Sequence, residues 1–253
     1  MDESTFRYQL QTTGYVHFPG VISKDLVARL STGIDAAIAK ARANKHAIGN
    51  YAYLAQNEGP AFVELLERSP LQSYVDMILT DTCIISGYSV ISNEPHQKNP
   101  IQTAIHRDHA RFSRPYLLTL NLLYLVDDFT KENGATYLLP GSQHAGEKPN
   151  EEYFYKNAIR VEGKAGDAVI FDSLVWHAGG VNETDKARRG ITKVYVRSYM
   201  RTQFDMPRAT TPEVADQLSE RSRRLLAFNV RMPGSLEEFF LPPEERLYKP
   251  NQG

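Results

Sequence analysis

The sequence predicts a mainly β domain with flanking α-helices, built as an antiparallel barrel or jelly roll. Between about residues 83 and 201 the chain contains short runs rich in Val, Ile, Leu and Tyr, separated by turn signals such as Asn133-Gly134 and Pro140-Gly141. No helical segments alternate regularly with these runs, which argues against a doubly wound parallel sheet. The runs are Cys83–Ser92, Leu117–Val126, Thr136–Leu139, Ile159–Val161, Ala168–Phe171 and Ile191–Tyr199.

The part of the chain before these runs is predicted to support the sheet with helices, over about residues 23–80. Gly14–Gly20 is typical of a short strand that ends in a Pro-Gly turn. Ser23 is a suitable N-cap, and the apolar residues after it recur at helical spacing. The predicted helices run from Ser23 to about Ala43, over Ala61–Leu66 and over Leu71–Leu79.

The part after the strands is predicted to be one helix and a tail, over residues 212–253. An amphipathic pattern after Pro212 indicates a helix over about Glu213–Phe228. The tail from Met232 to Gly253 contains four prolines and shows no period. Because the chain has no internal repeat, low-complexity tract or linker, we expect residues 1–253 to form a single domain with its β core at about 83–201.

Composition and charge exclude several classes of function. With 29 Lys and Arg against 30 Asp and Glu, the net charge is −1, and a nucleic-acid binder needs a basic excess. The single cysteine, Cys83, cannot form an internal disulfide, which fits a reducing compartment. No apolar run approaches the ~18 residues of a membrane span, and the polar start of the chain is unlike a secretory signal. We therefore expect a cytoplasmic protein with no nucleic-acid or membrane partner.

Two histidines and one carboxylate form a candidate metal site. Alternate residues of an extended segment face the same way, so His106 and Asp108 should point to one side while Arg107 points to the other. His177 follows a predicted strand and could supply a third ligand. Non-heme Fe(II) oxygenases place two imidazoles and one carboxylate on one face of the metal and leave the other positions open. A His-x-Asp triplet also arises by chance, so the prediction depends on its combination with His177 and the arginines that follow.

Arg188 and Arg189 open the last predicted strand, and Arg188 comes eleven positions after His177. A guanidinium at this place can reach into the barrel and hold a dicarboxylate by a two-point contact. A solvated arginine pair at a loop end is the ordinary alternative. The metal residues favour the binding role, and the pattern leaves open whether Arg189 shares it with Arg188.

Several motifs, taken in order, resemble the phytanoyl-CoA dioxygenase family. The resemblance runs over roughly residues 12–200 and rests on Gly14–Gly20, Thr103–His109, Leu120–Thr136, Leu139–Ser142, Gly166–Phe171 and Trp176–Arg189. It implies a double-stranded β-helix, a jelly-roll or cupin-like barrel, that uses Fe(II), 2-oxoglutarate and O2. His106, Asp108 and His177 match the iron ligands of the family, and Arg188 matches the arginine that holds the far carboxylate of 2-oxoglutarate. Gly179 stands where many members carry a serine, which removes one expected hydrogen bond to 2-oxoglutarate.

Further residues near this site are weaker candidates. Asn121 would face the barrel interior and pair there with 2-oxoglutarate or with a neighbouring group, and Gln102 could orient a ligand or the co-substrate. Three arginines at the expected mouth of the barrel would receive an anionic substrate, with a solvated loop as the equal alternative; they are Arg107, Arg111 and Arg114. Tyr51, Tyr53 and His96 lie in segments that could fold over the mouth of the barrel as a lid.

The predicted function is hydroxylation of an aliphatic C–H bond of a small metabolite, with release of succinate and CO2. Asp108 favours hydroxylation, desaturation or ring closure over halogenation, because related halogenases leave that coordination position to chloride. A cupin-type protein that binds Zn or Mn would need the three metal residues but not Arg188. A catalytically silent relative would bind 2-oxoglutarate without turnover, and a plain β-sandwich binding module would need neither feature.

Overall fold

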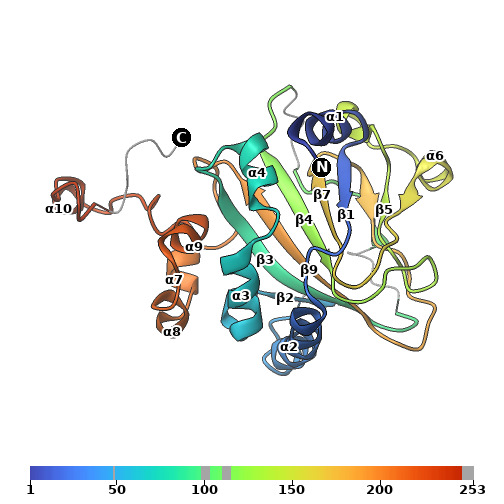
Figure 1. Cartoon of the computed structure of the whole chain (residues 1–253), viewed down its shortest axis with the longest axis horizontal. Helices are drawn as coiled ribbons and strands as arrows, with labels where there is room; N and C mark the ends of the chain where they lie inside the picture. Colours follow the sequence, from blue (N-terminus) through green and yellow to red (C-terminus); the bar gives the residue numbers. More distant parts are fainter. Residues whose placement is uncertain (48, 98–102, 110–114, 247–253) are drawn as a thin grey trace.

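A computed structural model of the chain describes residues 1–47, 49–97, 103–109 and 115–246. Its main feature is a six-stranded sheet in the order β1-β7-β4-β9-β3-β2, and all of its pairings are antiparallel (Figure 1). These strands are β1 (Tyr15–Phe18), β2 (Tyr51–Tyr53), β3 (Ile84–Asn93), β4 (Thr119–Leu125), β7 (Ala168–Asp172) and β9 (Arg188–Val196). A smaller sheet contains β6 (Ile159–Arg160), β5 (Tyr137–Leu138) and β8 (His177–Ala178). The predicted mostly antiparallel sheet with flanking helices is confirmed.

Helices cover one face of the large sheet. Side chains of α2, α3 and α4, such as Leu30, Leu65 and Val75, share a core with the sheet residues Leu122 and Ile170. The helices are α1 (Glu3–Thr13), α2 (Lys24–Ala43), α3 (Pro60–Arg68), α4 (Gln72–Leu79), α6 (Glu151–Asn157), α7 (Met206–Ala209), α8 (Pro212–Ala215), α9 (Glu220–Leu225) and α10 (Leu236–Phe239), with short 3₁₀ turns at Ala55–Asn57 and Ser142–His144. Within the described residues, no helix is long and apolar enough to cross a membrane.

The alternation of side chains along the strands gives the large sheet two different faces. In β4, Leu122 and Tyr124 join the helix-covered core, whereas Asn121 and Leu123 point to the opposite face. A register shift in β3 between Ile85 and Gly87 lets residues on both sides of this bulge reach that opposite face. The face away from the helices is therefore free to carry a site, and the small sheet lies toward it.

Two predicted elements have different boundaries in the structure, and three elements were not predicted. The predicted helix over Glu213–Phe228 is wrong as one piece, because Ser219 caps a new helix by accepting a hydrogen bond from the Ser222 N–H, and α8 and α9 form instead. The last strand begins at Arg188 rather than at Ile191. The sequence patterns also missed α1, β2 and α6. Of these, α1 and α6 are short surface helices with capping side chains from Asp2 and Asn150.

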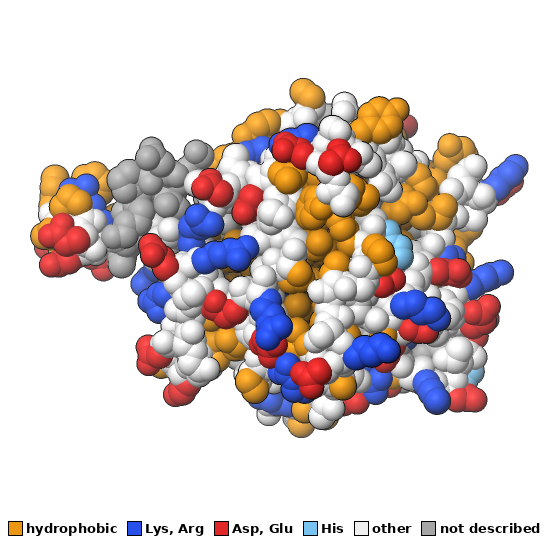
Figure 2. All heavy atoms as spheres, viewed as in Figure 1, with side chains coloured by type: hydrophobic (Ala, Val, Ile, Leu, Met, Phe, Trp, Pro, Cys, Tyr) orange, Lys and Arg blue, Asp and Glu red, His pale blue; other side chains and the backbone are white. Residues whose placement is uncertain are grey.

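The C-terminal segment after α9 leads away from the sheet. Figure 1 shows α10 at the end of an arm that projects from the rest of the molecule, and hydrophobic side chains lie at its outer end in Figure 2. Leu236 and Phe240 are 70% and 73% exposed there. The apolar residues of this tail therefore do not contribute to the core, in agreement with the absence of a period in the sequence.

Lys193 of β9 is fully buried in the helix-covered core. Its Nζ donates a hydrogen bond to the Leu65 carbonyl at 3.1 Å and lies 4.9 Å from the centre of the Tyr88 ring. Burial, together with the positive charge of Arg221, lowers the pKa of Lys193 from 10.5 to about 7. Between these two values the unfolded chain holds a proton that the folded chain lacks, so the free energy of unfolding must rise with pH.

We expect Lys193→Met to remove this pH dependence and to stabilise the protein at pH 7 by about 3 kcal/mol, since a buried amine is replaced by an apolar chain of similar length. Urea unfolding of both proteins between pH 7.5 and 9.5 measures the effect. Over this range the wild type should gain about 2 kcal/mol relative to the variant, at roughly 1.4 kcal/mol for each pH unit. Two parallel stability curves would show that Lys193 is not buried as an amine.

Candidate active site

His106, Asp108 and His177 come together at the edge of the small sheet. His106 and His177 exchange both backbone hydrogen bonds of an antiparallel bridge, at 2.9 and 2.8 Å, which sets their side chains next to each other. Asp108 lies two residues further along the same extended segment. One ligand atom from each of the three residues can be chosen so that all lie within 4.8 Å of one another. The His106 and His177 Nε2 atoms lie 3.4 and 3.6 Å from carboxylate oxygens of Asp108.

The orientation of both imidazoles fits a metal. Nδ1 of His106 lies 2.8 Å from the Ala104 carbonyl, and Nδ1 of His177 lies 3.0 Å from the Val175 carbonyl. A carbonyl only accepts, so each Nδ1 carries the proton and each Nε2 offers a lone pair toward Asp108. Burial lowers the pKa of His177, which favours the neutral form that a metal needs. The donor set could hold a transition metal such as Fe(II).

Asn121 holds the carboxylate of this group. Its Nδ2 donates a hydrogen bond to Oδ2 of Asp108 at 2.6 Å. Burial raises the pKa of Asp108, but the interactions with His177 and His106 and the hydrogen bond from Asn121 outweigh it, so the pKa lies below the usual value. The predicted pairing of Asn121 with 2-oxoglutarate would therefore have to compete with Asp108 for the same amide nitrogen.

We expect Asn121→Leu to weaken Fe(II) binding about tenfold, because the hydrogen bond that orients a ligand is lost while the volume of the side chain is kept. Competition with a coloured chelator under anaerobic conditions measures the affinity. Thr119→Val is the matched control, since Thr119 lies on the same face of β4 and its side chain does not contact Asp108 in the described contacts. Equal losses in the two variants would mean that the strand, rather than the hydrogen bond, holds the carboxylate.

Arg188 is a buried cation that lines a cavity together with the three metal residues. It is 2% exposed, its Nη2 donates to the Gly134 carbonyl at 3.2 Å, and its guanidinium lies 4.0 Å from the centre of the Phe129 ring. In the described part of the chain no carboxylate forms an ion pair with Arg188, and its Nε has no hydrogen-bond partner. Burial lowers its pKa to about 10, so it remains charged at neutral pH. An uncompensated buried guanidinium beside a cavity is a site for an anion.

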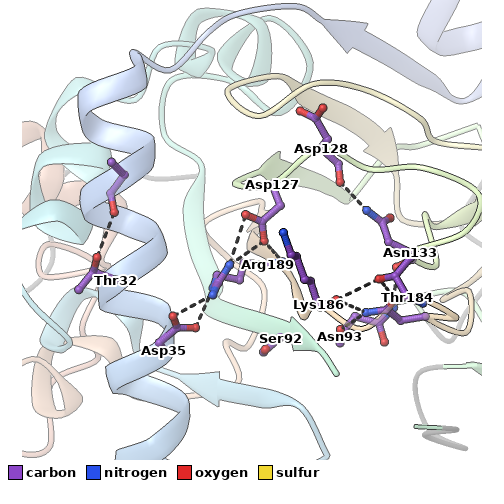
Figure 3. A network of polar contacts seen from close by, with 12 residues as sticks. Thr32, Asp35, Ser92, Asn93, Asp127, Asp128, Asn133, Thr184, Lys186 and Arg189 are labelled. Carbon is purple, nitrogen blue, oxygen red and sulfur yellow. Dashed lines mark hydrogen bonds and ion pairs between the residues drawn. The ribbon is translucent and has the colours of Figure 1, made fainter. Parts of the chain in front are cut away.

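Arg189 has a structural role and does not share the site. It points to the other face of β9, where it forms ion pairs with Asp35 of α2 at 2.7 Å and with Asp127 at 3.1 Å (Figure 3). These contacts join the helical layer to the start of β9, next to Arg188. They answer the question that the sequence left open, because Arg189 already has two carboxylate partners.

Arg107 is directed away from the metal residues, as alternation predicted. Its guanidinium lies 4.8 Å from the centre of the Trp176 ring and donates to the carbonyls of Ala145 and Gly146. It does not line the cavity, so the structure does not bring this predicted substrate residue to the site. The other predicted residues Gln102, Arg111 and Arg114 lie outside the described residues.

A cavity of about 420 Å³ connects the metal residues with Arg188. Leu123 and Phe171 form apolar parts of its wall, and Ser89 and Thr192 supply hydroxyl groups. Tyr51 and Tyr53 also line it, from the edge strand β2 rather than from a lid. Sequence patterns missed the lining residues of β3, such as Ser86 and Ser89, because short polar side chains within strands carry no distinct signal. Only their alternation with the core residues Tyr88 and Val90 could have indicated them.

The chain has a two-sheet β fold, and one cavity brings together two imidazoles, one carboxylate and a buried arginine. This arrangement defines a class of protein that can bind a metal and an organic anion side by side. The phytanoyl-CoA dioxygenase family profile matches residues 10–190. A protein of Mycobacterium tuberculosis is 32% identical over 235 residues, which cover 91% of this chain and 86% of that protein. The chain belongs to the phytanoyl-CoA dioxygenase family.

Solved structures share the fold at low sequence identity. EctD from S. alaskensis, in a structure with 2-oxoglutarate and 5-hydroxyectoine, has a TM-score of 0.68 at 19% identity, covering 80% of this chain and 78% of that one. The epimerase SnoN, in complex with Fe3+, alpha-ketoglutarate and nogalamycin RO, has a TM-score of 0.62 at 20% identity, covering 80% and 89%. These similarities establish the architecture of the chain, and its chemistry must be argued from its own residues.

Proposed function

We propose that the protein is an Fe(II)- and 2-oxoglutarate-dependent dioxygenase that hydroxylates an aliphatic C–H bond of a small molecule. The observation that carries this proposal is the buried Arg188, which forms no ion pair with any described residue and shares one cavity with His106, Asp108 and His177. The family membership and the metal and 2-oxoglutarate in the structure of SnoN support it. In this proposal the two sheets correspond to a double-stranded β-helix whose smaller sheet has short strands.

Each residue then has a distinct task. His106 and His177 present Nε2 to the metal because their Nδ1 protons are held by backbone carbonyls. Asp108 contributes the negative charge, and Asn121 fixes its orientation. When bound, Fe(II) allows O2 to oxidise 2-oxoglutarate to succinate and CO2 together with the substrate. Arg188 positions 2-oxoglutarate by binding its far carboxylate in two-point fashion.

The cavity walls protect this reaction from water. Leu123 and Phe171 cover the sheet side of the metal residues, and Phe129 lies under the guanidinium of Arg188. A low-polarity wall strengthens the interaction between Arg188 and a carboxylate, because it removes competing water. A protein that only bound Zn or Mn would have no use for a desolvated arginine in the same cavity as its metal ligands. This feature favours the oxygenase over the cupin-type alternative.

Turnover of 2-oxoglutarate tests the proposal. With Fe(II), ascorbate and O2, the protein should convert 2-oxoglutarate to succinate and CO2 in equal amounts, and slowly even without the primary substrate. Asp108→Ala should abolish this conversion. With a substrate found by screening, one atom from ¹⁸O2 should appear in the hydroxylated product. Binding of 2-oxoglutarate without any succinate, with and without substrates, would instead identify a catalytically silent relative.

A further inference from the structure

A second cavity adjoins the candidate active site along the large sheet. It has a volume of about 970 Å³, and its lining residues lie mostly between 198 and 207, around the start of α7, and between 227 and 232, after α9; both helices are seen in Figure 1. Its wall includes the apolar residues Ile84, Met200, Phe204, Ala227 and Val230 and the charged residues Arg201, Asp205 and Arg231. Gln203 lines both cavities and therefore stands at their junction. We call this second cavity the apolar groove.

The register of β9 sets the order of the groups along the sheet face. Arg188 pairs with Asn93 at one end of β3, and Val196 pairs with Ile84 at the other. Val194 lies between them opposite Asn121, whose amide contacts the metal residue Asp108. The order is therefore Arg188, then the metal residues, then the apolar groove.

This order limits where the primary substrate can lie. A 2-oxoglutarate molecule that reaches both Arg188 and the metal fills the side of the cavity next to Arg188. The substrate must then approach from the remaining side, toward Gln203 and the groove. On that side the described lining residues of the first cavity are uncharged, and four of them bear hydroxyl or amide groups: Ser86, Ser89, Tyr53 and Gln203.

Gly87 lines the first cavity next to Gln203, the residue that the two cavities share, and we call the space between these two residues the passage. A Cβ atom placed there would lie 3.5 Å from Oε1 of Gln203 and 3.6 Å from Cγ2 of Val194, which are ordinary contacts. A small side chain would thus fit, but a larger one would occupy the passage. Gly87 does not have a positive φ, so the backbone does not require glycine at this place. The lack of a side chain keeps the passage open instead.

We infer that the primary substrate is an elongated amphipathic molecule, with a hydroxyl-bearing end at the metal and an apolar part in the groove. This inference rests on the proposed function. It differs from the anionic substrate expected from the sequence: of the three arginines behind that expectation, Arg107 does not line the cavity, and Arg111 and Arg114 lie outside the described residues. Burial of apolar surface in the groove would supply most of the binding free energy, and the polar wall near Gln203 would set the orientation.

Calorimetry with a series of 1,2-alkanediols tests the inference, using 1,2-hexanediol, 1,2-octanediol and 1,2-decanediol below their micelle concentrations. The protein is loaded with 2-oxoglutarate and Mn(II), which binds such sites without turnover. Each added methylene should tighten binding about threefold in the wild type, because the chain extends into the groove. Affinities that do not depend on chain length would overturn the inference.

Two variants locate the effect. Gly87→Leu should abolish the dependence on chain length and leave the affinity for 2-oxoglutarate within about twofold, whereas the control Gly146→Leu, at an open surface position, should behave as wild type. Val230→Asp, a change inside the groove, should weaken decanediol more than hexanediol. Unchanged diol binding in both groove variants would also contradict the inference. Failure of the proposed function would appear separately, as absence of 2-oxoglutarate binding in the wild type.

Discussion

Replacement of Arg188 by Met should weaken 2-oxoglutarate binding by a factor of about 100 or more. The guanidinium would contribute two charge-assisted hydrogen bonds in a site without competing water, and each such bond is worth roughly 1.5–3 kcal/mol. Calorimetric titration of the Mn(II)-loaded protein with 2-oxoglutarate gives the affinity directly. The protein without ligand should not lose stability, because the variant removes a buried charge that has no carboxylate partner in the described part of the chain.

Arg189→Met provides the matched control for this prediction. The two arginines are neighbours in sequence, but Arg189 points to the helical layer and binds Asp35 and Asp127. Its replacement should lower the stability by about 1 kcal/mol and leave the affinity for 2-oxoglutarate unchanged. If Arg188→Met and Arg189→Met reduced the affinity for 2-oxoglutarate equally, that affinity would come from the overall positive charge and not from a contact with Arg188.

Replacement of His177 by Ala should weaken Fe(II) binding more than 100-fold. Changes to groups that only orient a metal ligand already cost about 10–100-fold, and His177 would be a ligand itself. His177 is 6% exposed and its Nδ1 is held by the Val175 carbonyl, so its replacement removes one of the three donor atoms that meet at the site. Metal content after anaerobic dialysis against a defined chelator measures the loss.

The control for this change is His96→Ala. His96 lies on the surface and contacts Asp185, with 61% of its side chain exposed, so its loss should not alter metal content. Asp108→Ala should weaken Fe(II) binding as well, but it leaves both imidazoles in position. Retention of a full equivalent of Fe(II) by His177→Ala would place the metal elsewhere in the protein.

Spacing in the sequence could predict which metal residues lie together because local backbone geometry determines it. The alternation of an extended segment sets His106 and Asp108 on one side and Arg107 on the other, and the structure shows this arrangement. The pairing of His106 with His177 is a long-range bridge, and the order of motifs was needed to anticipate it. The long strands β3, β4, β7 and β9 of the large sheet were also foreseeable, since buried runs of Val, Ile and Leu mark them, whereas the edge strand β2 was missed.

Other features depend on tertiary contacts that no local pattern contains. Arg188 and Arg189 are adjacent residues of the same type, and the sequence does not show which of them binds an anion. The carboxylates that pair with Arg189, those of Asp35 and Asp127, come from distant parts of the chain. The partner of Asn121 could not be read from the sequence either, because its hydrogen bond to Asp108 joins β4 to a segment outside that strand. The division of the C-terminal helix at Ser219 depended on a hydroxyl cap that competes with helix continuation.

The most direct test of the central claim is an anaerobic titration of the protein with Fe(II) and 2-oxoglutarate, followed by visible absorption. Chelation of 2-oxoglutarate to Fe(II) in this site should produce a metal-to-ligand charge-transfer band that saturates at one equivalent of each. The band should be absent in His177→Ala and should require much more 2-oxoglutarate in Arg188→Met. A wild-type protein that binds Fe(II) but develops no band at saturating 2-oxoglutarate would contradict the proposed function.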